Sequence, residues 1–472
     1  MTEKPLIDSK HRPENGRGGK AEPVPKQRYR RLPKGTHGLD PELVKQDQRE
    51  RLQAAMIELI AAKGYPSVRI SDLAKLAHVS PPTLYSLYAD KEELFLGTYE
   101  EIARRTAATV LSAYDVKGSP EQRLPAAMRT FAELAASEPE AISLLAVGAF
   151  GAGSKVLERR RETLRRLEDG IRQSRDRGAG GGAAGDLTVK AILGGIREVA
   201  ASRLREGREQ ELPGLSDALA SWAASYPRRL PAGLAPAADT GKVRPAACHE
   251  DSERARRAKG ALPSGPSDLP RKFIVESQRE RIVDATAAIV AEKGLAGLTI
   301  PEIARRANVS NQTFYSIYPS KNDALLGVQK IGLHQALQVS VEAYEGEQGG
   351  WPRAIAAGLR ALLEFLASEP AHAHLALVDT FAVSPAALKI RSITMQGFGV
   401  YLRPGYDLAA EPRAVPEIVA EAVVGGIWQI LHHFVESNCI DQLPEAAPQL
   451  IYFALAPFLG PEAAAAAALS SE

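Results

Sequence analysis

Residues 79–94 read "VSPPTLYSLYADKEEL", and 230 positions later residues 309–324 read "VSNQTFYSIYPSKNDA". At this offset the similarity runs without a gap through residues 46–97, where 20 of the 52 positions are identical. Farther along the chain the offset becomes 231, and "GGI" at 194–196 recurs at 425–427. This self-similarity predicts an internal duplication of one module of about 190 residues.

The segments around the repeated stretch have the pattern of three helices. Apolar residues recur at helical spacing in residues 52–60 and again in residues 282–290, and a glycine then marks the expected end of each helix. A second, shorter amphipathic segment follows. After a tight break, Ser80 or Ser310 stands where the N-cap of a third short helix is expected. A helix, a tight turn and a short helix with an exposed N-terminal end form the helix-turn-helix plan, whose second helix enters the major groove of DNA.

The third helix carries hydroxyl groups and aromatic rings that suit contact with a phosphate strand, and a lysine begins the helix after it. The alternative interpretation makes its tyrosines core aromatics of a small helical bundle, but their identical spacing in both copies favours DNA contact. A basic segment before the first copy and a lysine before the second are added as further candidates. The predicted DNA-contacting residues are Ser80, Pro81, Pro82, Thr83, Tyr85, Ser86, Tyr88, Lys91, Ser310, Asn311, Gln312, Thr313, Tyr315, Ser316, Tyr318, Lys321, Arg28, Arg30, Arg31 and Lys272.

The pattern V-S-x-x-T-[LF]-Y-x-x-Y-x-x-K, after two amphipathic helices, resembles the DNA-binding domain of the TetR (tetracycline repressor) family. The resemblance covers the head of each half. It implies an all-helical regulatory and dimerisation domain behind each head, a small-molecule pocket in that domain, and a helix that links pocket and head. Members of the family normally carry one head per chain and work as homodimers, so this chain resembles a covalently fused pseudo-dimer.

The expected fold class is therefore all-α, with two TetR-like modules. The expected divisions are a basic disordered tail (1–44), a first helix-turn-helix domain (45–100), a first helical regulatory domain (101–230), a linker (231–272), a second helix-turn-helix domain (273–330) and a second helical regulatory domain (331–464). By the resemblance, residues 187–205 with 215–230 and residues 415–435 with 444–458 form a four-helix interface between the modules, and further homodimerisation stays open.

The two copies differ where base edges would be met. The first copy has Pro81, Pro82 and Ser86, which can touch a thymine methyl group but donate few hydrogen bonds. The second copy has Asn311 and Gln312, whose amides can pair with adenine through two hydrogen bonds. The hypothesis is an operator with two unlike half-sites, in which the second head discriminates bases and the first relies on phosphate contacts.

Composition supports a helical protein without a metal or redox framework. The chain has 472 residues, 44% of them hydrophobic and 25% charged, and a net charge of +2, so any attraction to DNA must come from local clusters. One cluster is present in the first 36 residues, which hold ten Lys or Arg against four acidic residues. With two cysteines, Cys248 and Cys439, and no leader or long apolar run, a cytoplasmic protein is expected.

No catalytic motif supports an enzyme, and no cofactor is expected. The "GGGAAG" stretch at 180–185 follows no predicted strand, which favours a flexible connection over a dinucleotide site. Several histidines of the second half are likewise better explained without a metal. Candidate ligand-pocket residues, for which an ordinary place in the helical core is the favoured alternative, are Phe365, Phe381, Phe398, Tyr401, Trp428 and His432.

The favoured interpretation is a sequence-specific transcriptional regulator, in the first instance a repressor, that acts as a single-chain pseudo-dimer. A small-molecule ligand would release it or modulate it. The alternative is a helical sensor or protein-interaction scaffold in which one or both heads no longer bind DNA.

Overall fold

A computed structural model describes residues 40–114, 120–146, 154–176, 186–227, 229–234, 270–379, 385–409 and 415–470. All regular elements in these ranges are helical, which confirms the all-α prediction. None of the helices described there combines the length and the apolar composition needed to cross a bilayer. The tail with Arg28, Arg30 and Arg31, the "GGGAAG" stretch and Phe381 lie outside the described residues.

The two halves share one order of helices, to which the described part of the second half adds three elements. The first half comprises α1 (Pro41–Lys63), η2 (Tyr65–Ser67), α2 (Ile70–Leu76), α3 (Pro81–Leu87), α4 (Lys91–Tyr114), α5 (Pro120–Ser137), α6 (Pro139–Ala146), α7 (Ser154–Asp176), α8 (Asp186–Arg205), η4 (Glu209–Glu211) and α9 (Leu212–Ala224). The second half comprises α11 (Arg271–Lys293), η6 (Leu295–Gly297), α12 (Ile300–Arg306), α13 (Asn311–Ile317), α14 (Lys321–Gly346), α15 (Trp351–Ser368), α16 (Pro370–His374), η7 (Leu375–Asp379), α17 (Pro385–Val400), α18 (Pro404–Leu408), α19 (Val419–Glu436), η10 (Ile440–Ala446), α20 (Ala447–Leu459) and α21 (Pro461–Leu469). The added elements are η7, α18 and α21.

The first helix of each half ends at the predicted glycine. Gly64 has a φ of 73° and donates its backbone N–H to the carbonyl oxygen of Ile60 at 2.9 Å. Gly294 has a φ of 66° and donates in the same way to Val290 at 2.8 Å. Because a side chain is strained at such positive φ values, glycine is the residue that ends both helices at low cost.

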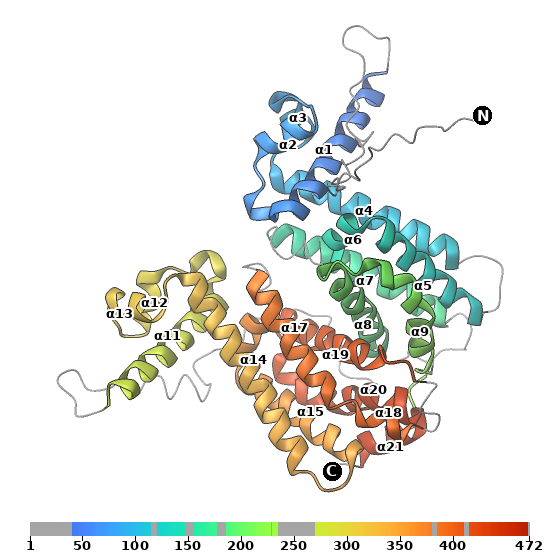
Figure 1. Cartoon of the computed structure of the whole chain (residues 1–472), viewed down its shortest axis with the longest axis vertical. Helices are drawn as coiled ribbons and strands as arrows, with labels where there is room; N and C mark the ends of the chain where they lie inside the picture. Colours follow the sequence, from blue (N-terminus) through green and yellow to red (C-terminus); the bar gives the residue numbers. More distant parts are fainter. Residues whose placement is uncertain are drawn as a thin grey trace, which may run out of the picture.

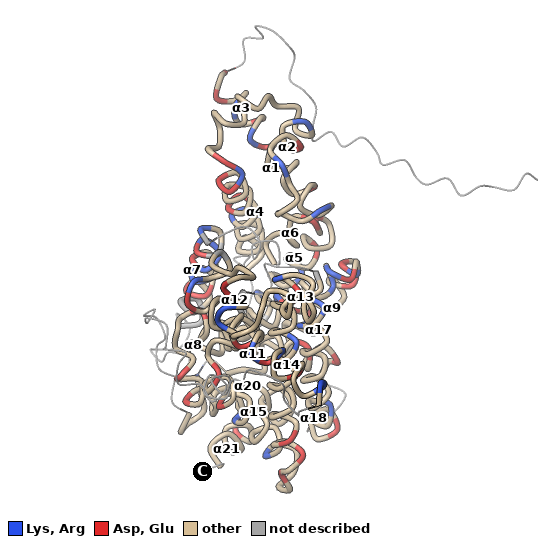
Figure 2. Tube along the Cα trace, turned by 90° about the vertical axis from the view of Figure 1, so that its left-hand side faces the viewer, with Lys and Arg blue, Asp and Glu red and all other residues tan. Residues whose placement is uncertain are grey.

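Two three-helix units, head 1 (α1–α3) and head 2 (α11–α13), project from separate corners of a larger helical body (Figure 1). The quarter-turned view of Figure 2 shows α3 at the upper end of the molecule and α12 and α13 about halfway down. A small hydrophobic core lies in each head, around Leu52 and Leu84 in head 1 and around Ile282 and Phe314 in head 2, and it continues into the first helices of the body. The long helices α4 and α14 lead from the heads into the body.

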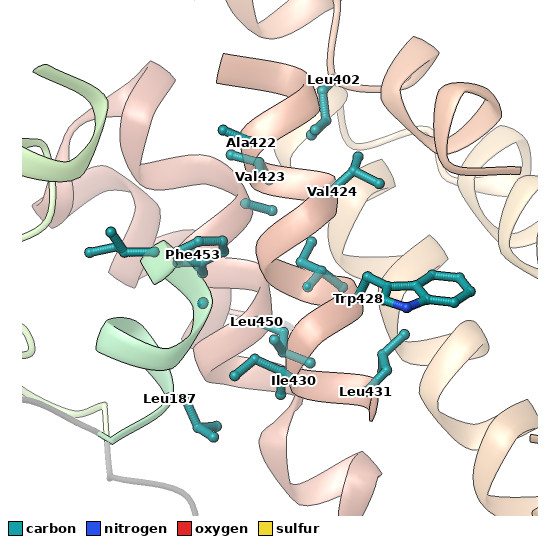
Figure 3. Packing of buried hydrophobic residues seen from close by; sticks show 14 of the residues in the cluster. Leu187, Leu402, Ala422, Val423, Val424, Trp428, Ile430, Leu431, Leu450 and Phe453 are labelled. Atoms are coloured by element: carbon teal, nitrogen blue, oxygen red, sulfur yellow. The ribbon is translucent and has the colours of Figure 1, made fainter. Parts of the chain in front are cut away.

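The body has one hydrophobic core to which both halves contribute. Leu187 of α8 lies near Ile430 of α19 and Leu450 of α20 in this core (Figure 3). In this core the ring of Tyr226 stacks on that of Phe453, with 4.7 Å between centroids, and the Tyr226 hydroxyl donates to the carbonyl oxygen of Phe453 at 2.9 Å. Burial raises the pKa of Tyr226 well above its ordinary value, so this hydroxyl stays a donor.

The repeated "GGI" sequences lie where α8 and α19 cross. A Cβ atom on Gly195 would come within 2.3 Å of the carbonyl oxygen of Ala422 and 2.5 Å of the Trp222 ring. On the other helix, a Cβ atom on Gly426 would come within 2.7 Å of the carbonyl oxygen of Ala191. Such distances are below any van der Waals contact, so the two backbones can approach this closely only because these positions lack side chains.

We predict that Gly195→Ala destabilises the body by about 1–3 kcal/mol, because the new methyl group must displace backbone of α19. The measurement is chemical unfolding followed by tryptophan fluorescence, since all three tryptophans, Trp222, Trp351 and Trp428, lie in the body.

Gly170→Ala is the matched control, because a Cβ atom on this glycine of α7 would have no neighbour within 4 Å. Alanine should leave stability unchanged there or increase it by about 0.5–1 kcal/mol. Equal losses in the two variants would contradict the close-packing argument.

Candidate nucleic-acid interface

The third helix of each head begins in the same way. The Ser80 hydroxyl accepts the backbone N–H of Thr83 at 3.2 Å, and the Ser310 hydroxyl accepts that of Thr313 at 3.0 Å. The two hydroxyls of each pair also bond one another, at 2.7 Å in α3 and 2.9 Å in α13. These bonds satisfy a backbone donor that a helix start leaves open, so they fix the end of the helix that would meet DNA.

A buried arginine holds the turn between the second and third helices. Arg281 of α11 donates from Nη1 to the carbonyl oxygens of Ala307 at 2.9 Å and Asn308 at 3.1 Å. Asn308 has a φ of 50°, in the left-handed region that makes the turn tight.

Arg51 does the same in head 1, where its Nη1 donates to Ala77 at 2.8 Å and to His78, which has a φ of 53°, at 3.3 Å. Sequence reasoning missed this pair of arginines. The signal was present in the repeated "QRER", whose last residue is the arginine in both copies.

One face of each third helix is exposed. The tyrosines stand out most, with Tyr85 at 55% and Tyr315 at 57% of their area open to solvent. Thr83 and Thr313 are half-buried because they belong to the N-terminal hydrogen bonds. The exposed residues of the two faces, all of them predicted DNA contacts, are Ser80, Pro81, Pro82, Tyr85, Ser86, Ser310, Asn311, Gln312, Tyr315 and Ser316.

Tyr88 and Tyr318 lie elsewhere than predicted. Their exposed fractions are only 8% and 9%, because each ring packs over a glycine of the following helix, Gly97 in α4 and Gly327 in α14. A Cβ atom on Gly327 would come within 2.8 Å of the ring of Tyr318. The prediction that these two rings face a phosphate strand is therefore corrected: they are core aromatics that join each head to its long helix.

The predicted cations at the start of α4 and α14 bind their own heads. Lys91 Nζ donates to the carbonyl oxygens of Tyr65 at 3.2 Å and Val68 at 3.1 Å, and lies 4.2 Å from the centre of the Tyr65 ring. Burial lowers the pKa of Lys91. Lys321 Nζ donates to Leu298 at 3.0 Å. An ammonium group has three donors, so contact with phosphate stays a prediction for the donors that remain.

Head 2 neutralises the cations beside its turn. Glu302 pairs with Arg305 at 2.8 Å and with Lys293 at 2.9 Å, and Arg306 pairs with Glu292 at 2.5 Å. Hydrogen bonds from Arg305 and then Lys293 hold the pKa of Glu302 at about 2, so this carboxylate stays charged at neutral pH.

At the corresponding place, head 1 has cations that form no ion pair with a carboxylate of the described residues. Lys63 pairs with Asp72, but Arg69 and Lys75 make no ion pair with any residue that the structure describes. Lys272, the other cation predicted to contact DNA, is exposed in the first turn of α11. The two heads thus share one frame and differ in the charge around it.

The model of the family "Bacterial regulatory proteins, tetR family" matches residues 52–98 and 282–327. Each match runs from the first helix of a head into the long helix behind it. The two heads are therefore TetR-family helix-turn-helix DNA-binding domains, and the chain is a transcriptional regulator that carries them in tandem. The resemblance stated from the sequence is confirmed, and with it the two-module fold.

Solved structures similar to the chain include regulators of this kind. The fatty acid degradation regulator FadR from Bacillus halodurans is 17% identical, with a TM-score of 0.35, over 37% of this chain and 94% of its own. FadR from Bacillus subtilis, solved with stearoyl-CoA, is 19% identical, with a TM-score of 0.34, over 37% and 96%. A TetR-like regulator from Rhodococcus sp. RHA1 is 20% identical, with a TM-score of 0.34, over 40% and 100%. No curated protein matches the chain.

The predicted ligand-pocket residues divide between two cavities. Phe398, Tyr401 and Trp428 line an apolar cavity inside the second module, with about 780 Å³ of empty space that is partly open to solvent. Phe365 packs against the shared core without lining that cavity. His432 lines a second, polar cavity, to which Trp428 also contributes.

We predict that Arg281→Met loosens head 2 without unfolding the body. The variant removes the donor to two turn carbonyls, a loss of about 1–3 kcal/mol for groups left unsatisfied. Hydrogen exchange in the peptides that cover α12 and α13 should accelerate by about 10- to 100-fold.

The control is Arg279→Met on the same helix, where the side chain is 41% exposed and pairs with Glu276. Its exchange rates should stay near those of the parent. A head 2 that exchanges at the parental rate in Arg281→Met would remove the arginine from its proposed place in the turn.

Proposed function

We propose that the chain represses transcription as a single-chain pseudo-dimer, in which one polypeptide places α3 and α13 on two half-sites of one operator. The observation that carries the proposal is the pair of exposed helix faces, which start with the same serine and threonine hydrogen bonds in both heads. A face built twice in one chain suits two successive turns of a major groove, about 34–36 Å apart along B-DNA.

Contacts across the body support the pairing of the two halves. Besides the glycine crossing of α8 and α19, Arg203 Nη1 lies 3.0 Å from a carboxylate oxygen of Glu421, and Arg161 Nε lies 3.1 Å from one of Glu436. These contacts join first-half helices to α19. Family members that carry one head per chain need a second chain for such an interface, whereas this chain supplies both surfaces.

Division of labour between the heads follows from what each face exposes. The amides of Asn311 and Gln312 are exposed at the N-terminal end of α13 and can pair with a base edge. At the same place α3 exposes Pro81 and Pro82, which have no side-chain donor. Head 1 instead has open cations beside its turn, and cations bind the phosphate backbone whatever the sequence. The operator we propose therefore has two unlike half-sites.

We predict that Gln312→Ala relaxes base preference at one position of one half-site by about 1–3 kcal/mol, since one bidentate pairing is lost. Tyr315→Ala should weaken binding to every duplex by a similar factor, because its exposed side chain would contact the sugar–phosphate backbone of the DNA whatever the base sequence. Selection of duplexes from a random pool, followed by titration of the selected sequence and its single-base variants, measures both effects.

The matched control is Gln338→Ala on α14, a glutamine that donates to Glu342 at 2.8 Å and lies outside the heads. It should bind as the parent does. Equal losses at all bases for Gln312→Ala would contradict its assignment as a reader of sequence. If even random duplex shows no salt-dependent binding, the chain is instead a scaffold with inactive heads.

We further propose that the effector is a largely apolar small molecule that binds in the cavity of the second module. Leu333, Ala336 and Tyr344 of α14 form one wall of this cavity, and α14 is the helix that leads directly from head 2. A ligand that binds more tightly when α14 is in one position therefore also stabilises the corresponding position of head 2. Couplings of this kind amount to about 1–3 kcal/mol, enough to change operator affinity roughly 5- to 150-fold.

We predict that the uncharged fluorophore N-phenyl-1-naphthylamine binds this cavity saturably, because the lining is apolar. Leu359→Trp, which puts a larger side chain into the lining, should weaken binding of the probe by about tenfold or more. A fluorescence titration of the full chain measures the affinity.

Leu408→Trp is the control, since Leu408 is 53% exposed on α18 and the new ring points into solvent. It should leave probe binding unchanged. If the probe binds both variants as tightly as the parent, it occupies another place and the cavity loses its support as an effector site.

A further inference from the structure

A second cavity lies between the two modules, apart from the apolar one. It is formed by α7 and α8 of the first half and by α17 and α19 of the second, and it holds about 540 Å³ of empty space that is partly open to solvent. Unlike the other cavity, it has several charged side chains in its lining. Neither the DNA-binding faces nor the apolar cavity makes use of these groups.

The charges that line this cavity do not balance. Four arginines contribute to the wall, Arg160, Arg197, Arg205 and Arg391, against one carboxylate, Glu198, which leaves a net charge of +3. Glu198 lies 2.6 Å from Arg391 and 3.0 Å from Arg205, so its negative charge is already shared by two of the four.

Among the four arginines, Arg197 contributes most clearly to this excess of positive charge. Its Nη1 donates to the amide oxygen of Gln429 at 3.1 Å, and no carboxylate of the described residues lies within 4 Å of it. Burial first, and then the charge of Arg160, lower the pKa of Arg197 to about 9. Glu436 attracts Arg160, and Glu168 and Glu198 attract Arg197, but none of the three carboxylates forms an ion pair with Arg197. An anion that accepts hydrogen bonds from both guanidinium groups would offset their mutual repulsion.

The excess positive charge lies at a position where the two copies of the module differ. At the offset of 231, Arg160 and Arg391 are counterparts, and so are Arg197 and Trp428. In the second half the arginine is therefore accompanied by an aromatic ring: the Arg391 guanidinium lies 4.7 Å from the centre of the Trp428 ring. In the first half the corresponding partner is another cation. The cavity thus has a cationic side and an aromatic side.

We propose that the cavity between the modules is a binding site for an oxyanion, the phosphate or carboxylate group of a small metabolite, held by Arg160 and Arg197 with help from Arg391. Guanidinium groups match both kinds of oxyanion through paired N–H donors. The site is distinct from the apolar effector cavity, and the proposal that it binds an anion does not rest on DNA binding.

The surroundings of the site connect it to both heads. Tyr99 of α4 is near enough to Arg160 and Arg197 for their charges to offset part of the rise that burial causes in its pKa. On the other side, Arg391 belongs to α17, which packs against α14. An anion in the cavity would therefore act on the long helices of head 1 and head 2 together. This consequence, unlike the binding itself, rests on the proposed function.

The test is isothermal titration calorimetry of the full chain with sodium phosphate and with sodium citrate, against sodium chloride at equal ionic strength, joined to thermal unfolding in the same buffers. We expect saturable binding of at least one of the two anions, and a melting temperature that rises with its concentration. Phosphate binding without citrate binding assigns the site to phosphate groups, and the reverse assigns it to carboxylates.

Arg197→Gln should weaken binding of the anion by about 10- to 100-fold, the loss expected for hydrogen bonds to a charged group. In chloride the same variant should melt at a higher temperature than the parent, because a repulsion with Arg160 is gone. A purely structural arginine would give the opposite result in chloride. Arg203→Gln, on the same helix and also bridging the modules through Glu421, is the control and should keep anion binding.

The proposal is overturned if phosphate and citrate give no saturable heat and no stabilisation beyond chloride. It is also overturned if Arg197→Gln and Arg203→Gln lose binding equally. Should Arg197→Gln fail to fold, Arg197→Lys, which keeps the charge but not the paired donors, replaces it and should bind the anion more weakly than the parent.

Discussion

The crossing of α8 and α19 is the constraint on which the rest of the molecule depends. At Gly195 and Gly426 each backbone lies so close to the other helix that a methyl group has no space. Glycines weaken isolated helices, by about 0.5–1 kcal/mol relative to alanine, so their presence here reflects what the crossing needs. Around it the two halves bury one continuous core, which reaches from Met128 in α5 to Ala468 in α21. The position of each head follows from this body through α4 and α14.

The same three contacts hold both heads together. A buried arginine ties the turn to the first helix, a serine fixes the start of the third helix, and a tyrosine ring packs over a glycine of the long helix. These contacts use the interior and the backbone of the head. They leave the exposed face of α3 or α13 free to change, which is how Pro81 and Pro82 can stand where the other copy has Asn311 and Gln312 without altering the frame.

Because the two halves are parts of one chain, their sequences can differ, whereas the two subunits of a homodimer are identical. In a symmetric dimer every substitution appears on both sides of the interface. Here Arg197 faces the cavity from one half while Trp428 takes the corresponding place in the other, and an unequal, positively charged cavity results. Trp428 also lines the apolar cavity, so one side chain separates the two proposed ligand sites. The same freedom allows the difference between the recognition faces.

The sequence by itself determined the duplication, the helix-turn-helix frame and the ends of the helices around it, because those features depend on local rules: apolar periodicity, the caps at Ser80 and Ser310, and the glycines at 64 and 294. It could not say which side of a short helix would be buried. Tyr85 and Tyr88 look alike in the sequence, yet one is exposed and the other lies over Gly97, since burial depends on what the following helix presents. The arginines of the turn and the charged cavity between the modules were decided only by the tertiary structure, because they join residues that are far apart in the chain and are brought together by packing.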